Sequence, residues 1–416
     1  MNRIWWIAVA ALVFLSTILR NELLLLMAAL LGMLGLASFL WAKYCLEALH
    51  YRRDFDTTRL FHGDETNMFL EIVNAKPLPL SWLRVDEEFP AMLGVSQELT
   101  ELEGNPDDED LHRGRRSLVN VLSMRWYERV RRRYRIRGTK RGAWKIGPAQ
   151  IRSGDLFGFD IRRKSVPEHA QRILVYPRIV PVTELGLPAQ HPFGDHRSSR
   201  RLVEDPMRLM GSRDYSQGDN FRFIHWKATA RQQKLQSKVF EPSTTRPLAI
   251  FLNMQTSPLY HWEQDGDIRE YAISAAASIA RHTWEEGYAV GLYSNALLID
   301  GSGRQVRIAP QRHASQLVRL LEVMARIDAS RRTSIEKLLQ TESTRLLYGT
   351  TIVVVTATIT DKLKSVLLDL RRRGYGVALI ALGDATLTTP LRGVQYYHIG
   401  SYEEWHEFEK LDLRAE

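Results

Sequence analysis

A single cysteine, Cys45, occurs among the 416 residues of the chain. One thiol cannot form an internal disulfide, and the chain has no cysteine pair with which to build a zinc site. This composition excludes a disulfide-stabilised secreted scaffold and suits a reducing compartment.

The common catalytic motifs are also missing. The sequence contains no G-x-x-x-x-G-K-[ST] phosphate loop, no G-x-G-x-x-G after a strand, no H-E-x-x-H and no G-x-S-x-G. Enzyme classes that depend on these motifs are therefore disfavoured. A site assembled from residues far apart in the sequence stays open.

Apolar residues are concentrated at the start of the chain. An uncharged run from Ile4 to Leu19 is followed, after Arg20-Asn21-Glu22, by a run from Leu23 to Ala42 that is long enough to cross a bilayer. Two such runs predict a transmembrane helical hairpin within residues 1–50, and therefore a multi-pass membrane protein. A cleaved signal peptide and a buried helix pair in a soluble protein are the alternatives.

Basic residues flank the predicted hairpin on its open side. Arg3 precedes the first apolar run, and Lys43, Arg52 and Arg53 follow the second. Such flanks stay in the cytoplasm, so we expect an inner (cytoplasmic) membrane protein whose termini and soluble domains are cytoplasmic.

Residues 51–185 have the pattern of a β-rich domain. Short strand-like runs separated by glycine- and proline-containing turns occur from Asn67 to Phe89 and from Tyr134 to Phe159. They predict a β-sandwich-like domain. The polar segment from Thr100 to Arg116 is expected to be an exposed loop.

A row of arginines lies within this domain. On a strand, the two-residue period places one set of arginines on a single face: Arg129, Arg131, Arg133, Arg135 and Arg137. The face is either a solvated surface that prevents edge pairing or a platform for anionic lipid, and the net charge of +9 fits the second interpretation. Nucleic acid is not expected, because no aromatic stacking pattern accompanies the arginines.

Residues 246–416 alternate between apolar strand-like runs and helical patterns. This alternation predicts an α/β, Rossmann-like domain with a parallel sheet. Ligands of such sheets bind beyond the carboxyl ends of the strands, which here are the segments from Asn253 to Ser257 and from Thr356 to Asp361.

The stretch from Gly211 to Pro242 combines many charged and aromatic residues. We expect a helix from about Asn220 to Arg231, capped by Asp219 or Ser216, and then a strand from Leu235 to Phe240. The linker motif, residues 186–245, contributes the candidate site residues Arg213, Asp214, Tyr215, Gly218, Asp219, Arg222, His225, Trp226, Lys227 and Arg231.

Two functions fit these residues. As a docking element, the segment would be fixed by arginine–aspartate pairs and by burial of Ile224 and Trp226, with its exposed side facing a partner. As a hydrolase-like or other enzyme, it would use His225 as a general base oriented by Asp214 or Asp219. The docking interpretation is favoured, because the spacing supplies no nucleophile.

Several motifs together resemble a bacterial family, the domain of unknown function 58. They are R-G-x-W-x-I-G-P at 141–148, D-L-F-G-F at 155–159, V-Y-P-R-I-V at 175–180 and the R-D-Y-x-x-G-D motif that begins at Arg213. The resemblance implies a von Willebrand factor A-like last domain, residues 246–416, and association with a MoxR-type AAA+ ATPase. From it we expect a membrane-anchored scaffold or adaptor that works with such an ATPase in protein assembly or envelope maturation.

The chain departs from von Willebrand factor A modules at their metal site. Where those modules carry D-x-S-x-S, this chain has Asn253, Gln255 and Ser257, so the carboxylate is missing. We therefore expect no metal and no cofactor, because Mg²⁺ is usually held by at least one carboxylate. Weak Mg²⁺ binding with the help of Asp361 is the alternative.

Overall fold

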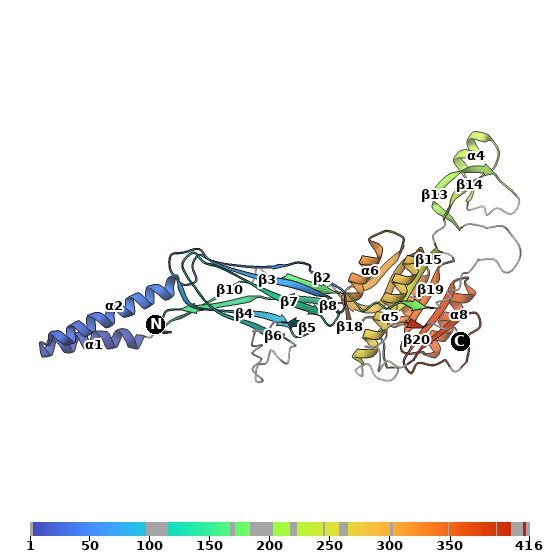
Figure 1. The fold of residues 1–416 in the computed structure, drawn as a ribbon. Helices are drawn as coiled ribbons and strands as arrows, with labels where there is room; N and C mark the ends of the chain where they lie inside the picture. The colour runs from blue at the N-terminus through green and yellow to red at the C-terminus, as the bar shows by residue number, and fades with distance from the viewer. Residues whose placement is uncertain are drawn as a thin grey trace. The chain divides into compact units, whose positions relative to one another are not determined.

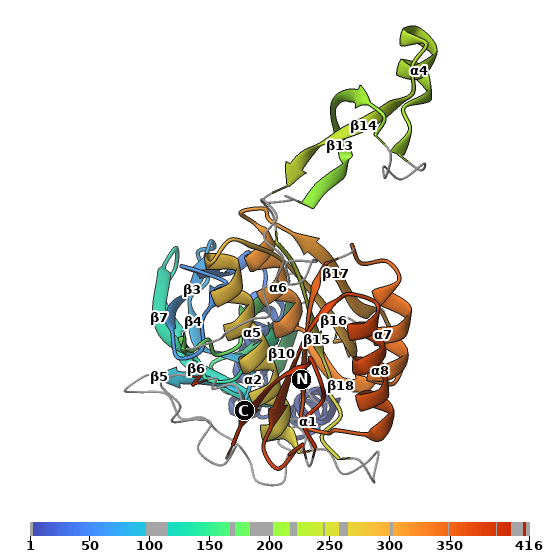
Figure 2. The ribbon, with the colours of Figure 1, turned by 90° about the vertical axis from the view of Figure 1, so that its right-hand side faces the viewer.

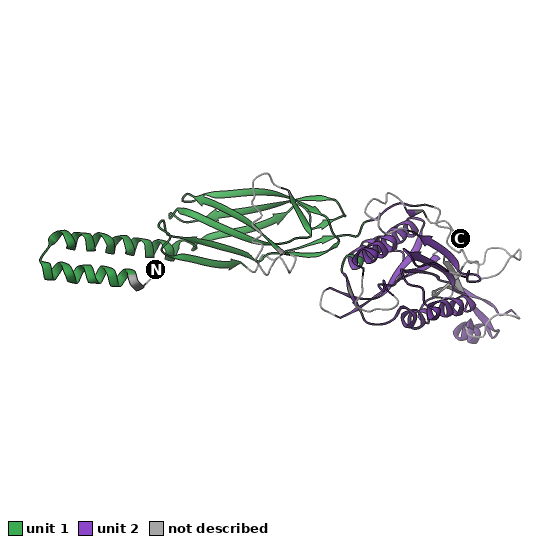
Figure 3. Cartoon of the chain, turned by 90° about the horizontal axis from the view of Figure 1, so that it is seen from below, with its two compact units in different colours: residues 1–178, 324–326 green, residues 179–323, 327–416 purple. Residues whose placement is uncertain are grey.

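The protein is described here from a computed structural model, which covers residues 3–96, 115–166, 171–183, 203–216, 223–243, 246–257, 265–299, 303–347, 349–387, 389–400 and 411–412. The chain forms two compact units (Figure 3). Unit 1 comprises residues 1–178 with 324–326, and unit 2 comprises residues 179–323 with 327–416.

Unit 1 begins with two apolar helices, α1 (Arg3–Leu19) and α2 (Glu22–Tyr44). The turn between them is closed by Asn21, whose side chain accepts hydrogen bonds from the backbone N–H groups of Leu23 (3.0 Å) and Leu24 (3.4 Å). This is a regular N-cap, which satisfies donors at the start of α2. Of the helices described, α2 with 23 residues is long and apolar enough to cross a membrane, whereas α1 has 17 residues. The structure thus supports one candidate membrane helix.

The rest of unit 1 is built from strands, as the sequence predicts (Figure 1). The strands are β1 (Leu49–Phe55), β2 (Arg59–Leu60), β3 (Glu65–Asn74), β4 (Leu80–Pro90), β5 (Leu93–Ser96), β6 (Arg115–Met124), β7 (Arg129–Gly138), β8 (Gly142–Ile146), β9 (Ala149–Gly154), β10 (Ile161–Val166) and β11 (Gln171–Val175). They form two four-stranded sheets, in the orders β1-β3-β7-β5 and β10-β9-β4-β6, and a three-stranded sheet, β2-β11-β8.

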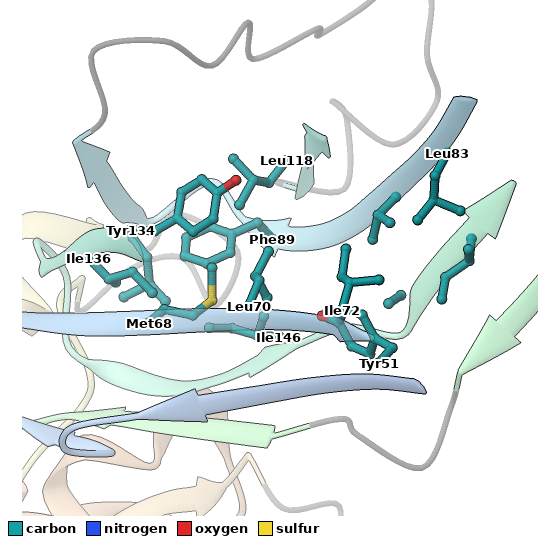
Figure 4. Packing of buried hydrophobic residues seen from close by; sticks show 14 of the residues in the cluster. Tyr51, Met68, Leu70, Ile72, Leu83, Phe89, Leu118, Tyr134, Ile136 and Ile146 are labelled. Atoms are coloured by element: carbon teal, nitrogen blue, oxygen red, sulfur yellow. The ribbon is translucent and has the colours of Figure 1, made fainter. Parts of the chain in front are cut away.

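The core of unit 1 follows from the alternation of its strands. In β3 every second residue is buried, which directs Met68, Leu70 and Ile72 inward. They pack with Phe89 of β4 and Tyr134 of β7 in one cluster (Figure 4). Burying each of these large side chains contributes about 1.5–3 kcal/mol. Two sheets therefore share one core.

Unit 2 contains the predicted alternation of strands and helices. The elements are β12 (Val182–Thr183), β15 (Arg246–Leu252), α5 (Gly266–Glu285), β16 (Tyr288–Leu298), β17 (Gln305–Gln311), α6 (Gln316–Ala325), β18 (Ile327–Arg331), α7 (Ile335–Ser343), β19 (Thr351–Thr356), α8 (Asp361–Arg372), β20 (Gly376–Leu382), β21 (Gln395–Ile399) and β22 (Leu411–Asp412). The main sheet has the order β17-β16-β15-β19-β20-β21, and β18 pairs with β16.

Five neighbouring strands of this sheet, from β16 to β21, run parallel, while β17 and β18 are antiparallel to β16. Helices α5 and α6 lie on one face, and α7 and α8 lie on the other (Figure 2). The carboxyl ends of the parallel strands form the edge that carries the predicted strand-end site.

An antiparallel hairpin precedes the main sheet in the sequence: β13 (Val203–Asp214), α4 (Trp226–Gln232) and β14 (Gln236–Ser243). The helix expected from Asn220 begins instead at Trp226, because His225 is its N-cap. Residues 217–222, and with them Gly218, Asp219 and Arg222, lie outside the described part of the chain.

Candidate functional site

The hairpin is held together by backbone pairing on both sides of α4. Tyr215 N donates to Leu235 O (2.8 Å), and His225 N donates to Gln236 O (2.8 Å). Ile224 forms an isolated bridge with Ser237 and is 3% exposed. The predicted burial of Ile224 is confirmed, and the backbone around α4 has a defined path.

The imidazole of His225 is used for capping. Its Nδ1 accepts a hydrogen bond from the backbone N–H of Ala228 at 3.0 Å. Because Nδ1 is the acceptor, a neutral ring carries its proton on Nε2. His225 would have to give up the cap to accept a proton at Nδ1, so this contact does not favour a general base.

The polar neighbours of His225 also have structural partners. Asp214 Oδ1 accepts a hydrogen bond from Gln236 Nε2 across the strand pair, and Arg213 Nη1 donates to the backbone oxygen of Asp214 at 3.2 Å. Arg213 thus contacts the main chain of Asp214 within the same strand. Asp219, the second candidate orienting group, lies outside the described residues.

Helix α4 presents its side chains outward. None of its residues is buried, and Trp226 is 68% exposed, so the prediction that Trp226 packs inside the protein is wrong. Lys227 and Arg231 are exposed, as expected. Trp226 is exposed because the helix begins later than predicted. Ile224, which lies before the N-cap His225, occupies the buried position instead. The result is an exposed tryptophan with cationic neighbours on one short helix.

The strand-end residues of unit 2 form a closed polar network. Asn253, 2% exposed, donates through Nδ2 to Thr356 Oγ1 (2.9 Å) and lies 3.3 Å from Thr358 Oγ1. Its Oδ1 accepts from Asn295 Nδ2 (2.8 Å) and from Gln255 N (3.1 Å). An amide oxygen with two donors has no lone pair left for a cation. The residues at this edge therefore do not fit a Mg²⁺ site.

The two other predicted metal positions with side-chain contacts point to the same interpretation. Gln255 donates through Nε2 to the backbone oxygen of Ser257 at 3.0 Å. Asp361 is the first residue of α8, has a side chain that is 96% exposed, and pairs with Lys364 Nζ at 3.0 Å. Among the described residues, no group of three His, Cys, Asp or Glu side chains could hold a metal ion. Sequence analysis did not identify Asn295 as a member of this network. Asn295 lies on the neighbouring strand β16, and its distance from Asn253 in the sequence gives no sign of the contact.

The arginine row lies on β7 as predicted, with all five arginines exposed and the alternate positions turned inward. Strand β7 pairs with β3 over residues 129–137, and β5 pairs with its last residues, 135–138. Each arginine of the row has a contact with a residue of β3 or of the turn before it: Glu71 with Arg129 (3.3 Å), Phe69 under Arg131 (4.3 Å to the ring centroid), Asn67 with Arg133 (2.9 Å), Glu65 with Arg135 (3.5 Å) and the Gly63 carbonyl with Arg137 (3.3 Å).

Arg53 does not act as a basic flank of the helical hairpin, contrary to the sequence interpretation. It is 2% exposed and contacts Glu87, which is 0% exposed, through Nη1. Its Nη2 also donates to the Ile146 carbonyl at 3.0 Å. Burial lowers the pKa of Arg53 to about 10, and burial followed by the charge of Glu88 raises the pKa of Glu87 to about 8.

The comparisons with known proteins cover part of the chain. The family model described as "Protein of unknown function DUF58" matches residues 211–393, which include α4, β14 and most of the α/β sheet. The uncharacterized protein YeaD of Bacillus subtilis (strain 168) is 25% identical over 264 residues, which are 61% of this chain and 58% of that protein. The chain thus spans less than two thirds of the length of this relative.

Two solved structures are distant matches to part of the chain. Trypsin-activated alpha-2-macroglobulin from Escherichia coli is 16% identical, with a TM-score of 0.20, over 32% of this chain and 7% of that one. A cohesin module from Clostridium perfringens is 11% identical, with a TM-score of 0.16, over 28% of this chain and 94% of that one. At these scores neither match carries an argument. The DUF58 family model, matched from Gly211 to Gly393, covers α4 and β14.

Proposed function

We propose that this protein is a membrane-anchored scaffold that presents the hairpin β13–α4–β14 to a protein partner. The observation that carries the proposal is the 68% exposed Trp226 on a helix without a buried residue, beside Lys227 and Arg231. Tryptophan and arginine are enriched among the residues that dominate binding energy at protein interfaces. A helix whose aromatic side chain is not used by its own fold is suited to such a contact.

The described chemistry supports binding over catalysis. His225 Nδ1 is engaged by the helix cap and Asp214 by Gln236, so these two side chains serve the shape of the hairpin. At the sheet edge, the Asn253 network is closed among its own members. The described groups that a catalytic or metal site would use, His225 and Asp214 in the hairpin and Asn253 and Gln255 at the sheet edge, thus have structural partners.

The anchor in this proposal is the helical pair α1 and α2, crossing the inner membrane as a hairpin with both ends in the cytoplasm. The exposed Lys43 and Arg52 supply the basic flank after α2. Unit 2 would be the von Willebrand factor A-like module, in keeping with its parallel sheet and helices on both faces. The resemblance of the motifs to the DUF58 family suggests a MoxR-type AAA+ ATPase as partner, in protein assembly or envelope maturation.

The experiment compares two exposed tryptophans in the full-length protein purified from membranes. Trp226→Ala should abolish co-purification of the MoxR-type ATPase while changing the free energy of unfolding by less than about 0.5 kcal/mol, because the side chain is exposed. Trp126→Ala, which removes another tryptophan of similar exposure (65%), should retain the ATPase. Retention of the ATPase by Trp226→Ala would refute docking through α4.

Two further variants separate docking from folding and from catalysis. Ile224→Ala removes a buried side chain and should cost roughly 2–5 kcal/mol of stability. His225→Ala removes the helix cap and should cost about 0.5–2 kcal/mol. A His225→Ala protein that folds and binds the ATPase but fails to complement a deletion strain would favour an enzyme instead.

A further inference from the structure

The turn between β9 and β10 exposes large apolar side chains. Leu156 is 60% exposed, Phe157 55% and Phe159 42%, and Ile161 at the start of β10 is 53% exposed. These residues belong to the D-L-F-G-F motif at 155–159, to which the proposed scaffold assigns no role. Contiguous exposed apolar residues on a folded domain mark an interaction surface.

This turn is attached to α2. Ser38, near the C-terminal end of α2, donates a hydrogen bond to Asp155 Oδ2 at 2.6 Å, and Trp5 of α1 contacts the ring of Phe159 with 5.1 Å between centroids. The buried Asp155 also accepts from Phe157 N (3.2 Å) and Asp160 N (2.9 Å). One carboxylate therefore shapes the apolar turn and fixes it beside the helices.

The position along α2 gives the depth of the turn. Lys76 donates through Nζ to the carbonyls of Cys45 (2.6 Å) and Glu47 (2.7 Å), which marks the end of the helix. Ser38 precedes Cys45 by seven residues, or about 10 Å along a helix. If α2 crosses a bilayer, the turn lies inside the membrane surface by about the depth of Ser38. Apolar side chains of interfacial segments reach a similar depth, roughly 5–10 Å into the boundary between head groups and acyl chains.

An exposed aromatic pair lies at the level of the helix end. Trp126 is 65% and Tyr127 67% exposed, in the turn between β6 and β7. Tyr127 N donates to the carbonyl of Lys76 at 3.3 Å, the residue whose ammonium caps α2. Tryptophan and tyrosine are enriched at membrane–water interfaces, because their rings are amphipathic.

Basic residues follow the apolar turn on β10, an edge strand of its sheet. Arg162, Arg163 and Lys164 are all exposed. Asp160 pairs with Arg162 at 3.1 Å, which leaves Arg163 and Lys164 as the adjacent excess of positive charge. Such residues next to an apolar segment attract anionic phospholipid head groups.

We infer that this end of unit 1 docks on an anionic phospholipid bilayer beside α2. Leu156 and Phe157 enter the acyl-chain region, Trp126 and Tyr127 lie at the interface, and the basic residues of β10 meet lipid phosphates. The inference rests on the proposed membrane anchoring of α2, and it makes the β domain part of the anchor. The D-L-F-G-F turn is then a lipid-contacting element, held at its depth by Asp155 and Ser38.

The test places a fluorescent NBD probe on single cysteines in the full chain, in a Cys45→Ala background. The protein is reconstituted in nanodiscs of phosphatidylcholine and phosphatidylglycerol that contain doxyl-labelled acyl chains. The probe at Phe157→Cys should lose about as much fluorescence to the doxyl groups as a probe at Leu30→Cys on the exposed face of α2. The control is Phe61→Cys, which replaces an exposed phenylalanine near the start of β3. Helix α2 ends near the opposite end of that strand, so a probe at position 61 should lose no fluorescence.

The three positions separate the possible failures. Quenching at position 30 without quenching at 157 overturns the docking of the turn and leaves the membrane anchor intact. No quenching at 30 overturns the anchor and, with it, this inference. Equal quenching at 61 and 157 would show that the unit lies along the bilayer and would overturn docking by one end.

The basic residues are tested in the same nanodiscs. Replacing Arg163 and Lys164 with glutamine should reduce quenching at position 157, while quenching at 30 stays unchanged. Replacing phosphatidylglycerol with phosphatidylcholine should have the same effect on the unsubstituted chain. Unchanged quenching in both experiments would refute a role for anionic head groups.

Discussion

Arg53 and the arginine row belong to the same sheet but face opposite sides of it. Arg53 on β1 points into the core, where Glu87, the Ile146 carbonyl and Gln171 surround its guanidinium. The row on β7 points outward and shares its contacts with β3 and solvent. A guanidinium that loses water needs several partners from the protein, whereas an exposed one does not. Identical residues on one sheet therefore differ in what their removal costs.

Unit 2 shows the same contrast between inward and outward polar groups. The side chain of the buried Asn253 bonds to Thr356 and Asn295 within its network, while Lys227 and Arg231 on α4 are exposed. Buried polar groups in both units contribute to stability through their partners. The exposed ones are the groups available to a lipid or a protein, so substitutions should affect folding in the first class and binding in the second.

The largest effect is expected for Arg53→Met. It leaves the 0% exposed Glu87 without its partner and should lower the free energy of unfolding by about 3–5 kcal/mol, measured by urea denaturation above the Glu87 pKa of about 8, where the carboxylate is charged. The neighbouring Arg52→Met removes an exposed arginine paired with Asp54 at 2.8 Å and should cost less than about 1 kcal/mol. The double variant Arg53→Met/Glu87→Leu should regain much of the loss. Equal costs for Arg52 and Arg53 would remove the contrast between the two faces.

A pH dependence should accompany the buried pair. Because the pKa of Glu87 is raised from 4.5 to about 8, the folded protein keeps a proton that the unfolded chain has lost. The contribution of Glu87 to stability is therefore fully present below 4.5 and is lost as the pH rises through about 8. Glu87→Gln cannot ionise, so its denaturation profile should be flatter over this range. Parallel profiles for the two proteins would show that Glu87 ionises equally in both states.

A smaller effect is expected at the strand ends of unit 2. Asn253→Ala leaves Asn295 Nδ2 and Gln255 N without their acceptor and should cost about 1–3 kcal/mol. Millimolar Mg²⁺ should leave the melting temperature of the unsubstituted protein unchanged, because an ion that does not bind cannot stabilise. Asp361→Ala, which alters an exposed residue, should behave like the unsubstituted chain. A shift of several degrees with Mg²⁺ that disappears in Asp361→Ala would show that a metal site exists.

Regular periodicity made much of the fold predictable. The bounds of α1 and α2 follow the two apolar runs, and the alternation in β7 correctly separates Tyr134 and Ile136 from the five arginines of the row. In unit 2, strands such as β15 and β19 are continuous apolar runs, as buried parallel strands require. These features depend on local spacing, which the sequence shows directly.

The candidate sites depended on contacts that spacing does not show. The start of α4 was misplaced because His225 caps the helix through its ring nitrogen, a role for which Asp219 and Ser216 were better candidates by residue type. The exposure of Trp226 followed from that shift. Arg53 was assigned to the membrane flank because its buried partner Glu87 is 34 residues away in the sequence. A local cap decided the first two outcomes, and a long-range contact decided the third.

The smallest effect on stability is expected for the arginine row. Replacing Arg131, Arg133 and Arg135 with glutamine removes three exposed charges and should change stability by less than about 1 kcal/mol per residue, because surface pairs contribute little. Binding of the full-length protein to added anionic liposomes should weaken by up to about 1 kcal/mol per arginine at low salt. The control variant replaces three exposed arginines of unit 2 with glutamine: Arg304, Arg312 and Arg319. It lowers the net charge of the protein by the same amount as the substitutions in the row. If both triple variants bind liposomes alike in co-sedimentation, net charge rather than the row determines the attraction, and the outward face of β7 is a solvated surface.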